Sequence, residues 1–84
     1  MKRIAVIGAI LENPQTSQKT FNELVSSFRG IVKGRMGIPF DLHQLSVISI
    51  TVVGTLDDIN TLTGKLGSLP YVTVKTAISN VELD

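Results

Sequence analysis

The sequence predicts an α+β fold in which two helices lie on one face of a four-stranded antiparallel sheet. Four short segments are apolar throughout or alternate between apolar and polar residues, which is typical of strands. Two other segments carry apolar residues three and four positions apart, which is typical of helices that bury one face. The six segments follow the order β-α-β-β-α-β, which is the split βαβ arrangement of ferredoxin-like domains.

The first strand is expected at residues 3–11, RIAVIGAIL, which is apolar on both of its alternating faces. Such a strand is usually central in its sheet and covered on both sides. A helix is expected directly afterwards, because Asn13 is able to cap its start and Pro14 suits its first position. Thr16 is a second candidate cap.

The first helix carries an apolar stripe formed by Phe21, Leu24, Val25 and Phe28. These residues are spaced at i, i+3, i+4 and i+7, so they share one side of a helix. Residues 29–30, Arg-Gly, form a stop signal.

The second strand is expected at residues 31–38 and overlaps an unusual stretch, KGRMGIP, at residues 33–39. A period of two places Val32, Gly34, Met36 and Ile38 on one face and Ile31, Lys33, Arg35 and Gly37 on the other. A phosphate-binding loop would need a helix directly after its glycines, and none is expected here. We interpret the stretch as an edge strand whose charges, Lys33 and Arg35, point outward and whose ladder ends at Pro39. A contact between Arg35 and an anion or ligand is the alternative.

The second half of the chain repeats the pattern. Residues 40–45 are expected to connect to a third strand at residues 46–53, SVISITVV. Thr55 is a candidate cap for the second helix, with Asp58 at the capping-box position, and the buried stripe is Ile59, Leu62 and Leu66. Gly67 is the expected left-handed cap. A fourth strand is expected at residues 71–78, followed by a short acidic tail at residues 79–84.

Right-handed crossovers give the strand order 4-1-3-2 and place both helices on the same face of the sheet. The other face then carries either the Ala5, Ile7, Ala9, Leu11 row or the Ile4, Val6, Ile10 row, together with Val47, Val53, Tyr71 and Ala77. An apolar face of this kind is more often an interface than a solvated surface. The sequence therefore predicts a homo-oligomer, either a dimer or a tetramer, formed through sheet faces or edges.

Composition limits the classes of function. The chain has 84 residues, so we expect one domain at residues 1–84, because a second core would not fit. The absence of cysteine excludes disulfides, thiolate metal sites and a cysteine nucleophile. A net charge of +1 provides no general attraction for nucleic acid, so direct binding to it is not expected. Without an apolar run of about 20 residues, we expect a cytoplasmic protein that does not span a membrane.

Few residues suggest a reactive site. His43 is the only histidine and, with Asp41, supplies at most a fragment of a metal site, since zinc or nickel needs three or four ligands. Asp57 and Asp58 are explained by their place at a helix start. No Ser or Thr has a convincing base nearby in the sequence. We therefore expect no enzymatic activity, no catalytic residue and no cofactor.

The remaining candidate is the turn expected after the first strand, which consists of Gly8, Ala9, Ile10, Leu11, Glu12 and Asn13. Gly8 permits close approach of a ligand, and the free amides at the start of the helix suit an anionic group. The alternative is a tight crossover turn without a ligand.

Three segments of the chain resemble one family. RIAVIGAILENP, KGRMGIPF and GTLDDINTLTGKLGSLPYVTVKTAIS are similar to small proteins described as regulators of the iron-only hydrogenase system. That family is similar in fold to ACT domains and to the C-terminal, metal-binding domain of the nickel-responsive repressor. The resemblance implies an ACT-like fold, assembly through the sheets, and small effectors bound at subunit interfaces.

The resemblance does not transfer every property. The nickel site of the repressor needs several histidines and a cysteine, whereas this sequence has one histidine and no cysteine. A ribbon-helix-helix segment that binds DNA is not expected, because the core strand is expected to begin at residue 3. ACT domains often bind effectors near the first strand-to-helix turn, here Gly8–Asn13, so this location is implied without a ligand identity. The resulting hypothesis is a non-enzymatic regulatory module that acts as an oligomer through an effector or a partner protein. The alternative is a metal- or small-anion-binding protein with an interfacial site that uses His43 and Arg35.

Overall fold

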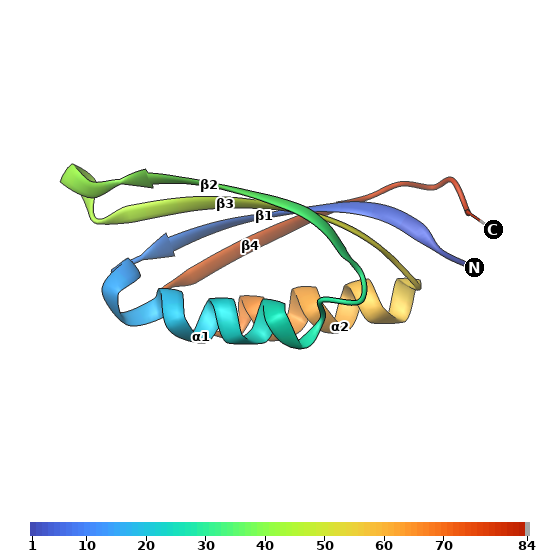
Figure 1. The fold of residues 1–84 in the computed structure, drawn as a ribbon, viewed down its shortest axis with the longest axis horizontal. Helices are drawn as coiled ribbons and strands as arrows, with labels where there is room; N and C mark the ends of the chain where they lie inside the picture. Colours follow the sequence, from blue (N-terminus) through green and yellow to red (C-terminus); the bar gives the residue numbers. More distant parts are fainter. Residues whose placement is uncertain (84) are drawn as a thin grey trace.

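The computed structural model of the protein describes residues 1–83 and has the predicted α+β architecture. Its elements are β1 (Arg3–Glu12), α1 (Pro14–Ser27), β2 (Val32–Phe40), the short 3-10 helix η1 (Asp41–His43), β3 (Leu45–Gly54), α2 (Leu56–Gly67) and β4 (Val72–Ile78). The antiparallel sheet has the order β2-β3-β1-β4, as predicted. Both helices lie on one side of the sheet and leave its other side open (Figure 1).

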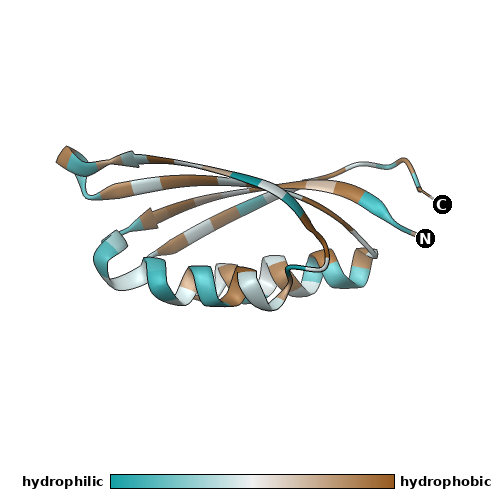
Figure 2. Ribbon diagram, viewed as in Figure 1, coloured by the Kyte–Doolittle hydropathy of each residue, from teal (hydrophilic) through white to brown (hydrophobic). Residues whose placement is uncertain are grey.

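The core lies between the sheet and the helices. Ala5, Ile7, Ala9 and Leu11 of β1 are buried beneath the helices, whereas Ile4, Val6 and Ile10 lie on the open side and are each more than two-fifths exposed. The sequence could not distinguish these two rows, because both are apolar (Figure 2).

The helices contribute the apolar stripes that their sequences predict. Phe21 and Val25 of α1 and Ile59, Leu62 and Leu66 of α2 are buried in the core. Leu24 and Phe28 are partly buried against the same cluster. Helical periodicity therefore identified the packing face of each helix correctly.

Only one of the predicted helix caps forms as expected. The Thr55 hydroxyl accepts a hydrogen bond from the amide of Asp58 at 3.1 Å. Asn13 occupies the cap position of α1, but it adopts a left-handed conformation and its side chain makes no capping bond. Thr16 lies inside α1 and is not a cap. Gly67 is the last residue of α2 and has no left-handed conformation, so the prediction of a glycine cap there was wrong.

The edge strand β2 contains a β-bulge at Lys33. Val32 pairs with Val52, and Gly34 pairs with Thr51, so one extra residue lies between the two pairs. An extra residue reverses the alternation of faces on one side of the bulge. A period of two had placed Val32 on the same face as Met36 and Ile38. Because of the bulge, Val32 packs against the core, whereas Met36 and Ile38 lie on the open face.

The hairpin between β2 and β3 is longer than predicted. Pro39 pairs with Ser46, and Phe40 pairs with Leu45, so the ladder continues past the proline instead of ending there. Pro39 is tolerated because β2 is an edge strand and one of its sides needs no amide donor. The chain reverses through η1 and Gln44, which has a positive φ of 56°.

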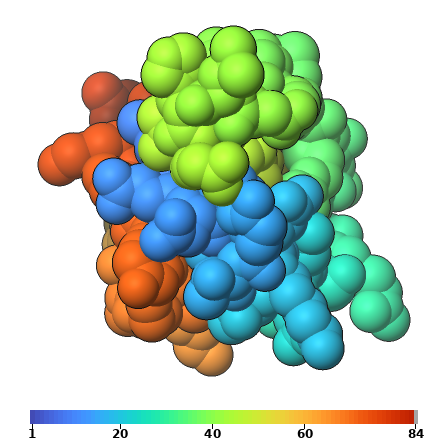
Figure 3. Space-filling model, turned by 90° about the vertical axis from the view of Figure 1, so that its left-hand side faces the viewer, coloured from blue at the N-terminus to red at the C-terminus, as the bar shows by residue number. Residues whose placement is uncertain are grey.

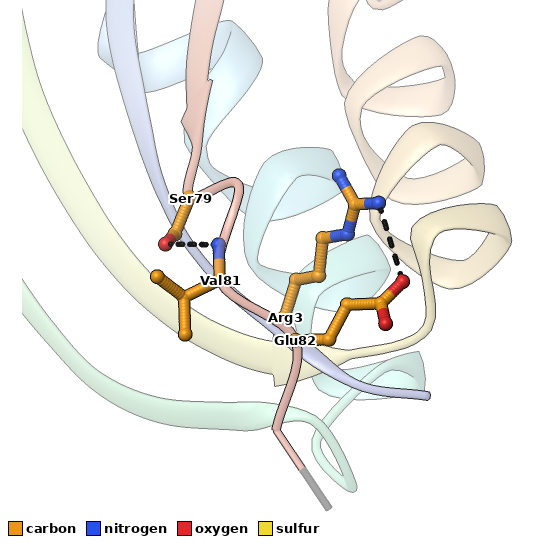
Figure 4. Close-up of polar contacts among 4 residues, drawn as sticks. All are labelled: Arg3, Ser79, Val81 and Glu82. Atoms are coloured by element: carbon orange, nitrogen blue, oxygen red, sulfur yellow. Dashed lines mark hydrogen bonds and ion pairs between the residues drawn. The ribbon is translucent and has the colours of Figure 1, made fainter.

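The described part of the tail continues the sheet beside the start of β1. The Ser79 amide donates to the Ile4 carbonyl at 2.9 Å, and Lys2 and Leu83 exchange two backbone hydrogen bonds of 3.2 and 2.6 Å. Arg3 and Glu82 form a partly exposed ion pair of 3.7 Å (Figure 4). Asp84, the last residue of the predicted tail, lies outside the described residues.

The molecule is elongated, with principal extents of 43 × 18 × 17 Å. The hairpin of β2 and β3 forms one end, and the two chain termini lie at the other (Figure 1). The α-helices of residues 1–83 are α1 and α2. Neither is long and apolar enough to cross a bilayer.

Candidate functional site

A cleft of about 240 Å³ opens where the start of α1 meets the β2–β3 hairpin. Its apolar walls are Pro14, Gly37, Pro39, Leu45 and Ile48. In Figure 3, which views this end of the molecule, the hairpin tip (yellow-green) lies above the start of α1 (blue). The cleft is on the helix side of the sheet, because Gly37 and Pro39 pair with Ile48 and Ser46, whose side chains face the helices.

Four polar side chains also line the cleft: Gln18, Arg35, Asp41 and Ser46. They come from α1, β2, η1 and β3 respectively, so four elements must be in place before the site exists. The group combines one cation, one carboxylate, one amide and one hydroxyl. Such a set can orient a small polar molecule through charge and hydrogen bonds.

Arg35 is fixed over α1 by two contacts. Its guanidinium carbon lies 5.9 Å from the centre of the Phe21 ring, and its Nη2 donates to Asn22 Oδ1 at 2.9 Å. The side chain therefore leans across the first helix and lines the cleft. The prediction that Arg35 points outward as a simple edge-strand charge is not what the structure shows.

Ser46 is the most enclosed polar residue of the cleft. It is 7% exposed, and no hydrogen bond from its hydroxyl to residues 1–83 is found. Every fully enclosed side-chain nitrogen or oxygen in that part of the chain has a partner. The Ser46 hydroxyl therefore keeps contact with the open space of the cleft, where a water or a ligand can bond to it.

A smaller hollow of about 190 Å³ adjoins the cleft and shares Pro14, Asp41 and Leu45 with it. Here Gln15 Nε2 donates to Gln44 Oε1 at 2.8 Å, and the Asn13 amide donates to the Gln44 carbonyl at 3.2 Å. These two bonds tie the hairpin tip to the start of α1. They set the width of the cleft, because the two sides of the cleft are the elements that they join.

The structure separates the residues that the sequence offered as one effector site. Residues 8–12 belong to strand β1, and only Asn13 forms the turn. Gly8 pairs with Ser49 and Lys75 in the middle of the sheet and does not line the cleft. Of the candidate set, Arg35 alone lines it, while Asn13 lies next to Pro14 at its edge.

His43 does not join Arg35 in either hollow. It lies in η1, is exposed, and lines neither space. Among residues 1–83, no group of three or more His, Asp or Glu side chains is placed to hold a metal ion. The two residues of the alternative interfacial site therefore do not form a site together within one chain.

Sequence reasoning missed Gln18 and Ser46 and considered Asp41 only as a fragment of a metal site with His43. Each has an ordinary explanation in the sequence, as a helix surface residue, a loop acid or the first residue of a strand. The signal that could have revealed them is the strand order, because a β2–β3 hairpin brings Pro39 opposite Ser46.

The open face of the sheet is a second candidate surface. Its exposed apolar side chains are Ile4, Val6, Ile10, Met36, Ile38 and Phe40. Val47 and Val53 of β3 are half-buried between them. Apart from Lys33 at the bulge, the charged residues of strands β1–β4 on this face are Glu12 and Lys75.

Known proteins resemble this chain in both sequence and structure. A family model described as "TM1266-like: Iron-only hydrogenase system regulator, putative" matches residues 3–76. The structure of the uncharacterized protein TM1266 from Thermotoga maritima is similar at a TM-score of 0.89 and 28% identity, covering 93% of this chain and 98% of that chain. No protein with a curated description matches the sequence. Because the family model spans most of the sequence, the chain belongs to the TM1266-like family of iron-only hydrogenase system regulators.

Proposed function

We propose that the protein is a non-enzymatic regulatory module of the iron-only hydrogenase system that acts in the cytoplasm as a homo-oligomer. In this proposal residues 1–84 work as one ACT-like domain, and an effector or a partner protein supplies the signal. The observation that carries it is the open apolar face of the sheet. Membership of a regulator family supports the regulatory role.

The open face is large enough to hold a second copy. Four strands spaced about 4.8 Å apart, with a rise of about 3.3 Å per residue, present a flat area of roughly 500 Å². Side chains that stand from such a face bring its accessible surface toward the roughly 800 Å² that each partner buries in a standard interface. Ile4, Val6 and Ile10 form its centre, on a strand that hydrogen-bonds on both sides.

The charges on this face favour a copy of the same chain as the partner. In a two-fold interface every contact occurs twice. If one residue of the first copy contacts a different residue of the second copy, the same two residues also meet with the copies exchanged. Glu12 and Lys75 have opposite charges, lie on different strands and are separated along the sheet. A two-fold axis between them would bring Glu12 of each copy against Lys75 of the other, and both charges would be paired at the edge of the apolar contact.

Strand β2 offers a physical link between an effector and assembly. Arg35 and Gly37 line the cleft, whereas Met36 and Ile38 lie on the open face. A molecule in the cleft would therefore contact every second residue of β2. The residues between them would contact the second copy across the open face. An effector can change assembly only if it binds more tightly to one of two positions of β2 and the open face assembles better in one of them. Such a difference in affinity is the general condition for coupling between two sites.

Light scattering at micromolar concentration tests assembly directly. We expect a mass of two or four times the 9.1 kDa of the chain. Val6→Lys, which places a charge in the centre of the open face, is expected to give monomers with unchanged circular dichroism, because burying an unpaired charge is costly.

Asn60→Lys is the matched control, because it adds the same charge at an exposed position of α2. It is expected to leave the mass unchanged. A wild-type protein that stays at 9.1 kDa over the whole concentration range would refute the oligomeric part of the proposal.

A further inference from the structure

We infer that the cleft between α1 and the β2–β3 hairpin binds a small monocarboxylate that carries a hydroxyl group, with Arg35 on the carboxylate and Ser46 on a polar oxygen. The inference rests on the effector part of the proposed function and names the chemical class of the effector. It concerns residues that lie on the helix side of the sheet, away from the open face.

Arg35 is the anion-binding group. The ion pair found within residues 1–83 is Arg3–Glu82, so no carboxylate of that part of the chain lies within 4.0 Å of the Arg35 guanidinium. A guanidinium has five N–H donors in a planar fork, which matches the two oxygens of a carboxylate. One of them bonds to Asn22, and the guanidinium carbon lies 5.9 Å from the centre of the Phe21 ring, which adds a cation–π contact. The remaining N–H donors are available to a ligand. Because the Asn22 and Phe21 contacts already restrict the Arg35 side chain, ligand binding costs less side-chain entropy.

Ser46 is the second group, and it is independent of Arg35. The residue is 7% exposed and lines the cleft, and no hydrogen bond joins its hydroxyl to another group of residues 1–83. The opposite residue on β2 is Pro39, which has no amide hydrogen to offer. The neighbouring strand therefore offers no amide donor to this hydroxyl, and water or a ligand in the cleft can bond to it.

Size and charge narrow the ligand class. A volume of about 240 Å³ is below the roughly 300–1,000 Å³ of sites for drug-sized ligands, so the occupant is a small metabolite. Asp41 adds a negative charge to the lining, which opposes a dianion and favours a ligand with one carboxylate. The Asp41 carboxylate and the Gln18 amide oxygen accept hydrogen bonds, so they suit a ligand hydroxyl. A phosphate dianion matches Arg35 but is repelled by Asp41.

The test is a titration of the ¹⁵N-labelled full chain, followed by two-dimensional NMR. The probes are acetate, lactate, glycerate and inorganic phosphate. Lactate or glycerate is expected to give saturable shifts at Gln18, Arg35 and Ser46, with weaker binding of acetate and of phosphate. The absence of saturable shifts with all three carboxylates would refute the inference, and tighter binding of phosphate would refute the ligand class.

Variants separate the cleft from general charge effects. Arg35→Gln is expected to weaken binding about ten-fold or more, because a charge-assisted pair is lost. Arg29→Gln removes the same charge from an exposed position at the end of α1 and is expected to change nothing. Equal loss in both variants would contradict a specific role for Arg35.

Two further variants probe the interior of the cleft. Ser46→Ala removes the hydroxyl and is expected to weaken hydroxy acids several-fold while leaving acetate unchanged. Gly37→Ala narrows the cleft without strain, because the added carbon would lie 3.9 Å from Ile48 Cγ1, which is an ordinary contact. Unchanged affinity in both variants would place the ligand elsewhere.

Light scattering on the same samples distinguishes this inference from the proposed function. An oligomer that shows no carboxylate binding would refute the inference and leave assembly standing. A monomer that binds lactate or glycerate at Arg35 would support the inference and refute the assembly part of the proposed function. Loss of assembly in Arg35→Gln, together with no binding of the probes by the wild type, would refute a small-molecule site and indicate that Arg35 contributes to assembly instead.

Discussion

Within residues 1–83, three residues other than glycine have a positive φ, and all three lie at the end of the molecule that holds the cleft. They are Asn13, Gln44 and Tyr71, with φ values of 48°, 56° and 67°. The Glu12 amide donates to the Tyr71 carbonyl at 2.8 Å, and the Asn13 amide donates to the Gln44 carbonyl at 3.2 Å, so the three turns are joined. Left-handed conformations cost free energy in residues that carry a side chain, and such costs gather at functional sites.

Asn13 gives a test of this cost. Asparagine tolerates the left-handed region better than other residues, and glycine enters it freely. Asn13→Ala is expected to lower the free energy of unfolding by about 1 kcal/mol, whereas Asn13→Gly stays within about 0.5 kcal/mol of the wild type. Urea denaturation followed by circular dichroism measures both values. Equal destabilisation by alanine and glycine would show that the Asn13 side chain, and not the backbone conformation, stabilises this turn.

At the level of single residues, sequence reasoning succeeded where one local interaction decides the outcome. Thr55 caps α2 because a threonine before a helix satisfies an amide three residues later. Asn13 was placed at the right position for the wrong reason, since its backbone and not its side chain matters there. Gly67 was expected to be left-handed, but Tyr71 has that conformation, because the geometry of the return to β4 decides which residue turns.

At the scale of elements, α2 and β4 are joined by one polar contact in an otherwise apolar layer. Thr63 of α2 and Thr76 of β4 share a hydrogen bond of 2.8 Å between their hydroxyls, in a partly buried position. The remaining contact between these layers comes from core residues such as Leu62, Leu66 and Val72. The pair therefore fixes the position of the helix along the strand, which apolar packing alone does less strictly.

A double-mutant cycle is expected to reveal this pairing. Thr63→Val leaves the Thr76 hydroxyl without its partner and is expected to cost about 1 kcal/mol in the free energy of unfolding, and Thr76→Val should cost a similar amount. The double variant should cost less than the sum, because no unpaired hydroxyl remains. Costs that add without coupling in urea denaturation would show that solvent already satisfies both hydroxyls.

The elements themselves were predictable because their periods are simple. Helical spacing identified Phe21 and Val25 in α1, and continuous apolar character identified β1 as a central strand. The bulge at Lys33 was not predictable, because one extra residue in an edge strand leaves the composition unchanged. It moved Val32 to the core, which shows how a single inserted residue overturns every face assignment before it.

At the scale of the whole molecule, the two candidate surfaces lie on opposite sides of the sheet. The cleft is on the helix side, and the apolar surface of Val6 and Ile10 is on the open side. The presence of an apolar face was predictable from β1, because both of its rows are apolar. The cleft was not predictable, because Gln18, Arg35 and Ser46 meet only through the tertiary fold.

A charge exchange tests the two-fold arrangement of the proposed oligomer. Glu12→Lys and Lys75→Glu should each weaken assembly, because like charges would then face each other across the interface, while the double variant should restore it. Small-angle X-ray scattering is expected to give a radius of gyration only modestly above the 12.7 Å of one chain, since copies stacked on their sheets add thickness and little length. A much larger radius would indicate contact through the ends or edges.

The backbone pairing of Lys2 with Leu83 has a mechanical consequence. The first residues of β1 and the segment that follows β4 lie side by side and run in opposite directions. A pulling force applied to these two ends would act across the strands and load their hydrogen bonds one after another. We therefore expect β1 and β4 to separate at low force when the protein is pulled by its two ends, because the hydrogen bonds break one at a time. A force along the strands would load many hydrogen bonds together and meet a much higher resistance.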